Sequence, residues 1–149
     1  MDDLERVLRA QPFCEGLADE HLALLVGCTL NLRFRAGEYL AREAQPADRL
    51  YLIRQGQVAL ELQRPGAEPI CVETLEAGDV LGVSSLTFHA AQLDCRARVA
   101  VIALGVDKHC LARKMNEDPK LGYAITSRLL ELTYARLSRH RLQLLDVYK

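Results

Sequence analysis

The feature that most constrains the fold is a hydrophobic period that changes twice along the chain. Residues 1–28 carry apolar side chains at helical spacing, and Pro12 and Gly27 interrupt the pattern. Residues 29–106 alternate apolar and polar side chains, which is typical of half-buried strands. From Asp107 the helical period returns. This order predicts an α+β, mainly β chain, with short N-terminal helices, an antiparallel β-roll or jelly roll, and a C-terminal helix pair.

The middle segment divides into short strands separated by polar or glycine-bearing turns. Many short strands at even spacing favour a rolled barrel or sandwich. At the turns, Gly37, Gly56 and Gly78 are expected to adopt positive φ, which costs glycine least. The predicted helices and strands are helices over 1–10 and 19–26, strands over 30–34, 39–40, 50–53, 58–62 and 70–74, two more strands within 95–106, and helices over 108–116 and 119–145.

The last helix carries two apolar stripes. Asp107 suits the N-cap of the helix before it, and Pro119 suits the first turn of the last helix. Two interpretations remain open: one stripe packs on the chain's own core while the other forms a homodimer interface, or both belong to one wide core-facing surface. The proposed interface stripe is Tyr123, Leu130, Leu137 and Leu144, and the neighbouring stripe is Ile125, Leu129 and Leu132.

The charge balance argues against a nucleic-acid or membrane role. The 149 residues include 19 basic and 20 acidic side chains, a net charge of −1, so no global positive field attracts phosphates. No apolar run approaches the roughly 18 residues of a membrane-spanning helix. The N-terminus begins with acidic residues and lacks the apolar segment of a signal peptide. We therefore expect a cytoplasmic protein without membrane contact.

Neither metal binding nor catalysis has support in the sequence. The five cysteines are scattered without a Cys-x-x-Cys pair, so we expect free, buried or half-buried thiols and no metal site. The four histidines lie far apart, and no nucleophile-elbow, Walker or dinucleotide motif occurs. We expect no catalytic residue, no cofactor and no enzymatic activity. The cysteines are Cys14, Cys28, Cys71, Cys95 and Cys110.

The stretch 78–97 has most of the features of an anion-binding loop. Loops that hold a phosphate usually present glycines, hydroxyls and free backbone N–H groups together with a fixed cation. Gly82, Ser84 and Ser85 supply the first three, but no arginine or lysine occurs before Arg96. The stretch therefore indicates a ligand pocket whose charge partner is missing from the usual place.

Glycine turns and apolar positions recur in four motifs along the chain. They are Pro12-Phe13-x-x-Gly16-Leu17, Phe34-x-x-Gly37-Glu38-x-Leu40, Ala47-Asp48-x-Leu50-Tyr51-x-Ile53-x-x-Gly56-x-Val58 and Leu75-x-x-Gly78-Asp79-x-x-Gly82. In this order they resemble the cyclic-nucleotide-binding domain family of the catabolite-activator/fumarate-nitrate-regulator type. The resemblance implies one domain over residues 1–149, with helices over 1–28, the β-roll over 29–106 and helices over 107–149.

The segment after Gly82 departs from that family at two positions. The resemblance implies a Glu that holds the ribose hydroxyl, where this chain has Val83. It also implies an Arg paired to the cyclic phosphate, where either His89 or Ala91 stands. Histidine does not reproduce the two-point fork of arginine, so we predict weak or absent cAMP and cGMP binding and a small anionic or nucleotide-like ligand. The candidate ligand-binding residues are Gly82, Val83, Ser84, Ser85, His89 and Arg96.

Each candidate also has a structural interpretation. Ser84 and Ser85 either donate to an anion or cap a short helix or turn. His89 either contacts a ligand or is an ordinary surface or packed side chain. Arg96 is expected to form a structural ion pair rather than a ligand contact. The expected acidic partners of Arg96 are Asp94 and Asp79.

Cations near the end of the last helix have a simple explanation. Arg136, Arg139 and Arg141 suit the helix dipole and are expected to form a solvated face rather than a nucleic-acid contact. Transcription factors of the family continue into a helix-turn-helix domain, whereas this sequence ends at Lys149. No DNA-binding domain is therefore expected.

The sequence predicts a non-enzymatic regulatory sensor or adaptor that signals through its C-terminal helix to a protein partner. It is predicted not to bind cAMP or cGMP in the usual way. Two alternatives remain. One is a genuine cyclic-nucleotide-binding signal-transduction protein with altered pocket contacts. The other is a structural homodimer whose pocket is filled by Phe88 and Leu86.

Overall fold

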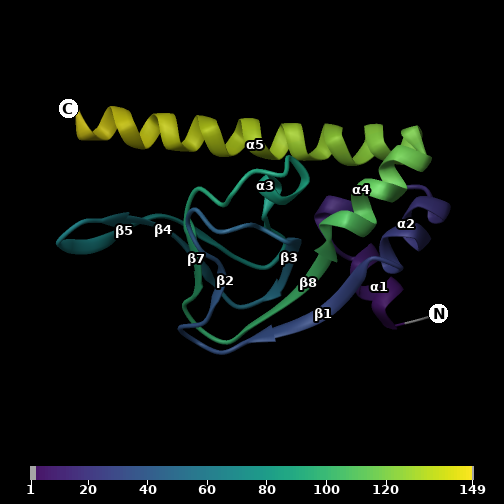
Figure 1. Ribbon diagram of the computed structural model, residues 1–149, viewed down its shortest axis with the longest axis horizontal. Helices are drawn as coiled ribbons and strands as arrows, with labels where there is room; N and C mark the ends of the chain where they lie inside the picture. Colours follow the sequence, from purple (N-terminus) through teal and green to yellow (C-terminus); the bar gives the residue numbers. More distant parts are fainter. Residues whose placement is uncertain (1–2, 149) are drawn as a thin grey trace.

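Two antiparallel four-stranded sheets form a β-roll, which helices cover at one end and along one side (Figure 1). The computed structural model describes residues 3–148. The predicted α+β, mainly β architecture is confirmed. The elements are α1 (Asp3–Arg9), η1 (Pro12–Cys14), α2 (Asp19–Val26), β1 (Thr29–Phe34), β2 (Tyr39–Ala41), β3 (Arg49–Gln55), β4 (Val58–Arg64), β5 (Ala67–Leu75), β6 (Val80–Leu81), α3 (Val83–Leu86), β7 (Asp94–Ala97), β8 (Val101–Asp107), α4 (Lys108–Glu117) and α5 (Pro119–Val147).

The two sheets face each other across an apolar interior. One sheet has the strand order β1-β8-β3-β6 and the other β2-β7-β4-β5. Ile53 of the first sheet and Val58 and Leu60 of the second belong to one buried cluster, which fills the roll. A second cluster joins the outer surface of the roll to the helices, and Leu52 and Leu104 contribute to it. Alternate residues of a strand thus serve opposite faces, as strand geometry requires.

The glycine turns have the predicted conformation. Gly37, Gly56 and Gly78 have φ values of 91°, 98° and 93°. At Gly56 a Cβ atom would also collide with the backbone carbonyl of Ala100. This turn therefore needs glycine for two reasons, the positive φ and the close approach of the neighbouring chain.

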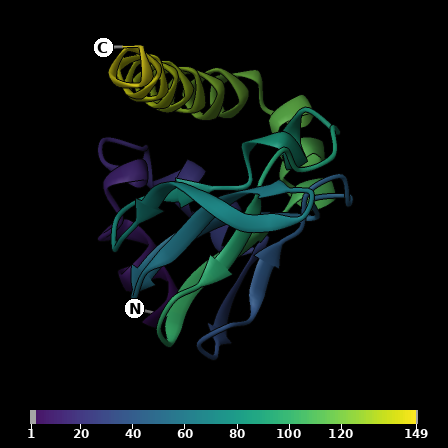
Figure 2. The ribbon, with the colours of Figure 1, turned by 90° about the vertical axis from the view of Figure 1, so that its left-hand side faces the viewer.

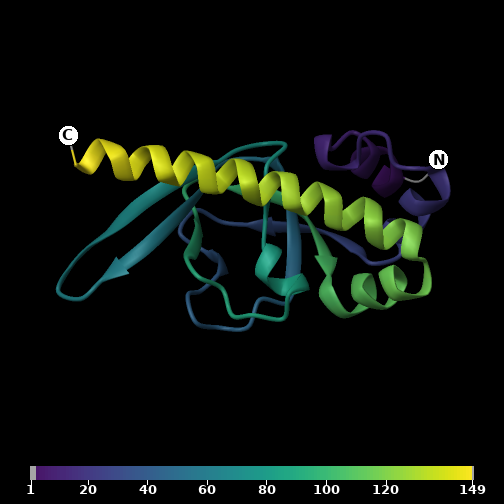
Figure 3. The same cartoon turned by 90° about the horizontal axis from the view of Figure 1, so that it is seen from above.

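Local signals define the two C-terminal helices. The Asp107 carboxylate accepts a hydrogen bond from the Cys110 backbone N–H at 2.9 Å and caps α4, as predicted. Asp118 caps α5 in the same way, and Pro119 occupies its first turn. Helix α5 then runs along the roll toward the β4–β5 hairpin (Figures 1 and 3). In Figure 2 it is seen nearly end-on beside the two sheets.

Only one of the two stripes on α5 is buried. Ile125 is fully buried and Leu129 nearly so, and Leu132 packs against the same cluster. The interpretation that both stripes belong to one wide core-facing surface is therefore wrong, because the other stripe is exposed to solvent. Its members and their exposed fractions are Tyr123 (77%), Leu130 (70%), Leu137 (64%) and Leu144 (58%).

The expectation of five free, buried or half-buried thiols is wrong for three cysteines. Cys28, just after α2, and Cys110 of α4 form a disulfide across 82 residues of sequence, with Cα atoms 5.6 Å apart. Cys71 is free but exposed, on the outer surface of β5. Sequence spacing alone does not reveal this pairing, because the fold brings the two helices together. Cys14 and Cys95 are buried free thiols, as expected.

Candidate ligand-binding site

A cavity of about 820 Å³ lies between the β-roll and α5, which is in the range of small-molecule sites. Strands of both sheets, the segment that contains α3, and one face of α5 enclose it. Its lining residues are Leu40, Ala41, Pro46, Ala47, Asp48, Arg49, Tyr51, Leu60, Leu62, Val72, Leu81, Gly82, Val83, Ser84, Thr87, His89, Ala91, Gln92, Leu93, Cys95, Thr133, Arg136, Leu137 and His140.

The segment that follows β6 lies directly against β3. Gly82 has a φ of 93°, and a Cβ there would collide with the backbone carbonyl of Arg49. Glycine thus allows the chain to turn into α3 while touching the neighbouring strand. Gly82 also occupies the N-cap of α3. Four of the six candidate residues line the cavity, namely Gly82, Val83, Ser84 and His89.

Ser85 and Arg96 lie outside the cavity. Ser85 is fully buried, and its hydroxyl has no hydrogen-bond partner among the described residues. Neither serine caps α3 with its side chain. The N-cap position belongs to Gly82, which has no side chain to accept a hydrogen bond. Ser84, in contrast, lines the cavity. Arg96 of β7 pairs with Glu61 of β4 at 2.7 Å, so its role is structural.

The predicted partners of Arg96 were wrong because other groups occupy both carboxylates. Asp94 accepts hydrogen bonds from the Glu43 backbone N–H at 2.7 Å and from Gln63 Nε2 at 2.6 Å. Asp79 accepts the backbone N–H of Glu76 at 2.8 Å. Glu61 lies directly across the β4–β7 ladder from Asp94, within reach of Arg96.

Sequence reasoning missed the basic side chains that do face the cavity. The arginines Arg136 of α5 and Arg49 of β3 line it, and so does the imidazole of His140. Arg136 is only 19% exposed, so the predicted solvated face is wrong for this residue. Arg139 takes part in an ion pair, and Arg141 is exposed as expected. The four-residue spacing of Arg136 and His140 places both on one face of α5, which was the available signal.

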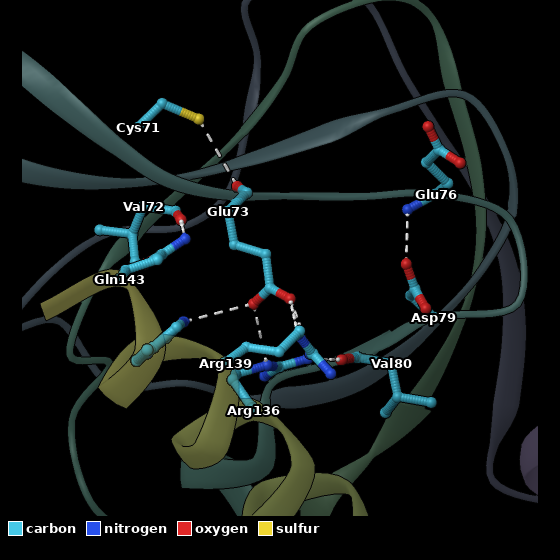
Figure 4. Close-up of polar contacts among 10 residues, drawn as sticks. Cys71, Val72, Glu73, Glu76, Asp79, Val80, Arg136, Arg139 and Gln143 are labelled. Atoms are coloured by element: carbon cyan, nitrogen blue, oxygen red, sulfur yellow. Dashed lines mark hydrogen bonds and ion pairs between the residues drawn. The ribbon is translucent and has the colours of Figure 1, made fainter. Parts of the chain in front are cut away.

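One carboxylate and two side-chain-to-backbone hydrogen bonds hold this part of α5 to the roll (Figure 4). Glu73 of β5, 14% exposed, forms ion pairs with Arg136 at 3.4 Å and with Arg139 at 2.6 Å, and His140 Nε2 lies 3.4 Å from the same carboxylate. Arg136 Nη2 also donates to the backbone carbonyl of Val80 at 2.8 Å. Gln143 Nε2 donates to the backbone carbonyl of Val72 at 2.8 Å, one turn further along.

Two titratable groups of the cavity wall, the Cys95 thiol and the Tyr51 hydroxyl, are neutral at ordinary pH. Burial raises the pKa of the Cys95 thiol to about 12, an effect that nearby Arg136 partly opposes. Burial also raises the pKa of the Tyr51 hydroxyl, and Arg49 opposes that shift. Both residues therefore act as uncharged wall groups next to an arginine.

The hypothesis of a filled pocket is wrong. Phe88 and Leu86, both described by the structure, do not line the cavity. Phe88 is 56% exposed, and its ring centroid lies 5.7 Å from that of His109 on α4. Leu86 packs against the helical core cluster. The positive φ of Phe88, 58°, directs this part of the chain toward α4.

Residues 3–148 contain neither a metal-binding cluster nor a membrane-spanning helix. No group of histidine, cysteine or acidic side chains in this range is arranged to hold a metal ion. No helix in the same range is both long and apolar enough to cross a membrane.

The β-roll, the segment after Gly82 and the C-terminal helix that covers the cavity together define the fold of a regulatory ligand-binding domain. The chain belongs to the cyclic nucleotide-binding domain family, whose model matches residues 31–118. Domains of this family are regulatory rather than catalytic.

Solved structures and a curated relative agree with this assignment. A cyclic nucleotide-binding domain from Methylobacillus flagellatus KT has a TM-score of 0.81 at 21% identity, over 96% of this chain and 81% of that one. A putative cyclic nucleotide-binding protein from Geobacter metallireducens GS-15 has a TM-score of 0.78 at 27% identity, over 92% and 99%. The cGMP-dependent protein kinase egl-4 of Caenorhabditis briggsae is 31% identical over 80 residues, which are 54% of this chain but only 10% of the kinase.

Proposed function

We propose that the chain, as a single domain over residues 1–149, is a non-enzymatic sensor or adaptor that does not bind cAMP or cGMP in the usual way. In this proposal a different small molecule occupies the cavity, and α5 passes the signal to a protein partner. The observation that carries the proposal is the pairing of an 820 Å³ cavity with a segment, 82–93, that faces it without a glutamate or an arginine.

The contacts that Val83 and His89 or Ala91 do not supply are worth a large part of the binding free energy of a cyclic nucleotide. The cyclic phosphate would lose a two-point, charge-assisted contact, and the ribose hydroxyl would lose its acceptor. Each loss costs about 1–3 kcal/mol, and about 1.4 kcal/mol is a factor of ten in affinity. Together they weaken binding by roughly two to four powers of ten. Val83 and His89, which face the cavity, provide no equivalent contact.

The route of the signal follows from the two faces of α5. Thr133 and Arg136 lie on the face that closes the cavity, so a ligand there contacts the helix directly. Tyr123 and Leu130 lie on an exposed stripe of the same helix, where a partner would bind. We propose that this stripe also pairs two copies of the chain. The proposed homodimer residues are Tyr123, Leu130, Leu137 and Leu144.

A second candidate function is genuine cyclic-nucleotide binding through altered contacts. The observation that favours it is the presence of Arg49 and Arg136 in the cavity wall, since either supplies a cation from outside the usual segment. The kinase egl-4, by its name, depends on cGMP, which is consistent with this candidate.

Isothermal titration calorimetry with cAMP and cGMP separates the two candidates. The proposal predicts no saturable heat for either nucleotide at ordinary protein concentrations. A dissociation constant in the micromolar range or tighter would overturn it and favour the second candidate.

A further inference from the structure

We propose that the ligand of this cavity is an amphipathic anion, with one acid group held by Arg49 and Arg136 and an apolar body against the leucine wall. The inference rests on the proposed function, because it names the ligand class of the same cavity. It differs from the usual site of the family in taking its cations from β3 and α5 rather than from the segment after Gly82.

Arg49 is a cavity cation without an acidic partner. Its side chain is half-buried, and no carboxylate of residues 3–148 forms an ion pair with it. The neighbouring Asp48 does not neutralise it, because that side chain is 76% exposed and lies 3.6 Å from Lys108 Nζ. A guanidinium that is partly removed from water calls for an anion or several acceptors. Tyr51, two residues along the same strand face, is an uncharged neighbour.

Arg136 belongs to a cluster with an excess of positive charge. Glu73 is the carboxylate that pairs with both Arg136 and Arg139, so one negative charge faces two positive ones. Arg136 Nη2 donates to Val80, and the Arg136–Glu73 distance of 3.4 Å involves Nε. The Nη1 group has no recorded partner among the described residues, so it is available to an acid group in the cavity.

The segment 80–82 contacts the side chain of Arg136 and the backbone of Arg49. Arg136 donates to the carbonyl of Val80, at the start of β6. Gly82, immediately after it, packs on the backbone of Arg49. Two residues of extended chain span about 7 Å, which two arginine side chains bridge readily. A carboxylate can accept hydrogen bonds from two guanidinium groups at once. Two arginines therefore favour a carboxylate over a neutral oxygen.

One part of the cavity wall is suited to an apolar body, while polar residues such as Ser84 and Thr133 line other parts. Cys95 contributes a thiol that stays protonated, because burial raises its pKa to about 12. Ribose hydroxyls or base edges placed against such a wall would lose their hydrogen bonds to water. The apolar wall residues are Leu40, Leu60, Leu62, Val72, Leu81 and Leu93.

Three probes of similar size test the inference on the full chain. Decanoate and 2-naphthoate each carry one carboxylate, on an aliphatic and an aromatic body, and 1-decanol is the neutral counterpart of decanoate. Because the chain contains no tryptophan, displacement of a fluorescent anilinonaphthalene sulfonate is free of protein fluorescence above the tyrosine region. We expect at least one carboxylate to bind at one site per chain, at least about tenfold tighter than decanol.

Substitutions identify the cations. Arg49→Gln and Arg136→Gln should each lower carboxylate affinity by about tenfold or more and leave decanol affinity unchanged. Arg54→Gln is the matched control, since Arg54 lies on the same strand, donates to Asn31 and does not line the cavity. If Arg136→Gln releases α5, Arg49→Gln alone still decides the question.

Equal affinity for decanoate and decanol, or carboxylate binding that neither arginine variant weakens, would overturn the inference. Either result leaves the proposed function intact, because the cavity would still bind a small molecule other than a cyclic nucleotide. No binding by any of the three probes also overturns the inference. Tight cyclic-nucleotide binding, which is measured in a separate titration, would instead overturn the proposed function.

Discussion

Glu73 of β5 and Arg139 of α5 lie 66 residues apart in sequence, and their side chains meet at 2.6 Å. Arg139 uses both Nε and Nη2 on the same carboxylate oxygen, at 2.7 and 2.6 Å. With Arg136 and His140 on the other oxygen, Glu73 is the main polar link between the β4–β5 hairpin and the second half of α5 (Figure 4). The position of α5 over the cavity thus depends on Glu73 together with the hydrogen bonds of Arg136 to Val80 and of Gln143 to Val72.

Removal of the Glu73 charge should loosen α5. Glu73→Gln leaves Arg136 and Arg139 without their counter-charge, which should cost about 1–3 kcal/mol of unfolding free energy. Hydrogen–deuterium exchange should rise in the second half of α5 and stay unchanged in α2. Glu68→Gln, at an exposed site on the same strand, is the control. Unchanged exchange in α5 would show that Glu73 does not hold the helix.

The exposed stripe of α5 predicts a homodimer. Leu130→Glu should convert a wild-type dimer into a folded monomer, because an isologous interface would bring two carboxylates into an apolar contact. Leu130 suits this test better than Leu137, which also lines the cavity. Leu30→Glu, an exposed leucine on β1, is the control. A monomeric wild type in light scattering at tens of micromolar would defeat the prediction.

Two glycines with similar φ separate backbone strain from steric contact. Gly56→Ala should destabilise by at least about 1 kcal/mol more than Gly37→Ala. Both residues have φ above 90°, but only Gly56 has the Ala100 carbonyl against its Cβ position, and no described atom lies within 4 Å of that position at Gly37. Urea unfolding measures the difference. Equal losses for the two variants would contradict the packing at Gly56.

The disulfide should contribute substantially to stability. Closing a loop of 82 residues corresponds to about 4.5 kcal/mol in the chain-entropy estimate. Cys28→Ser should therefore lower the unfolding free energy by roughly 2–4 kcal/mol and abolish its sensitivity to dithiothreitol. Cys71→Ser, at a free exposed thiol, should change neither quantity. Identical wild-type unfolding curves with and without reductant would contradict the pairing.

Buried thiols predict a loss of stability at alkaline pH. Burial raises the pKa of Cys95 from an ordinary 9.0 to about 12 and that of Cys14 to about 11. Between pH 9 and these values the unfolded state loses protons that the folded state keeps, so stability is full below pH 9 and falls as the pH rises. At pH 10.5 the Cys95 contribution is on the order of 2 kcal/mol.

Cys95→Ala tests this linkage. The variant should show a smaller decrease in unfolding free energy between pH 8 and pH 10.5 than wild type does. Cys71→Ser serves as the control, because that thiol is exposed in the folded state as well. A decrease of the same size in wild type and Cys95→Ala would rule out a contribution from Cys95.

Local patterns predicted most of the fold. The alternation from Leu30 to Phe34 corresponds to β1, and Asp107 caps α4 as its position suggested. Such features depend on neighbours within a few residues, so the sequence displays them directly. The resemblance in the glycine motifs supplied the family and its β-roll, which periodicity does not contain.

The parts that sequence reasoning missed are side-chain pairings between distant segments. Nothing near Glu73 in the sequence points to α5, and nothing near Cys28 points to Cys110. Arg136 was assigned to a solvated face because a helix period shows which residues share a face but not what covers it. The positions of the arginines in the cavity wall also depend on which distant segments come together. The fold could therefore be predicted from the sequence, but the charge of the site could not.

The central claim is that this cavity does not take a cyclic nucleotide in the family's usual way. The most direct test is a titration of ¹⁵N-labelled protein with cAMP up to 1 mM, followed at the backbone amides of Gly82, Val83 and Ser84. The account predicts no saturable shift at these amides, since the residues that would hold the ribose and phosphate are Val83 and His89 or Ala91. Saturable shifts with a midpoint in the low micromolar range would contradict it.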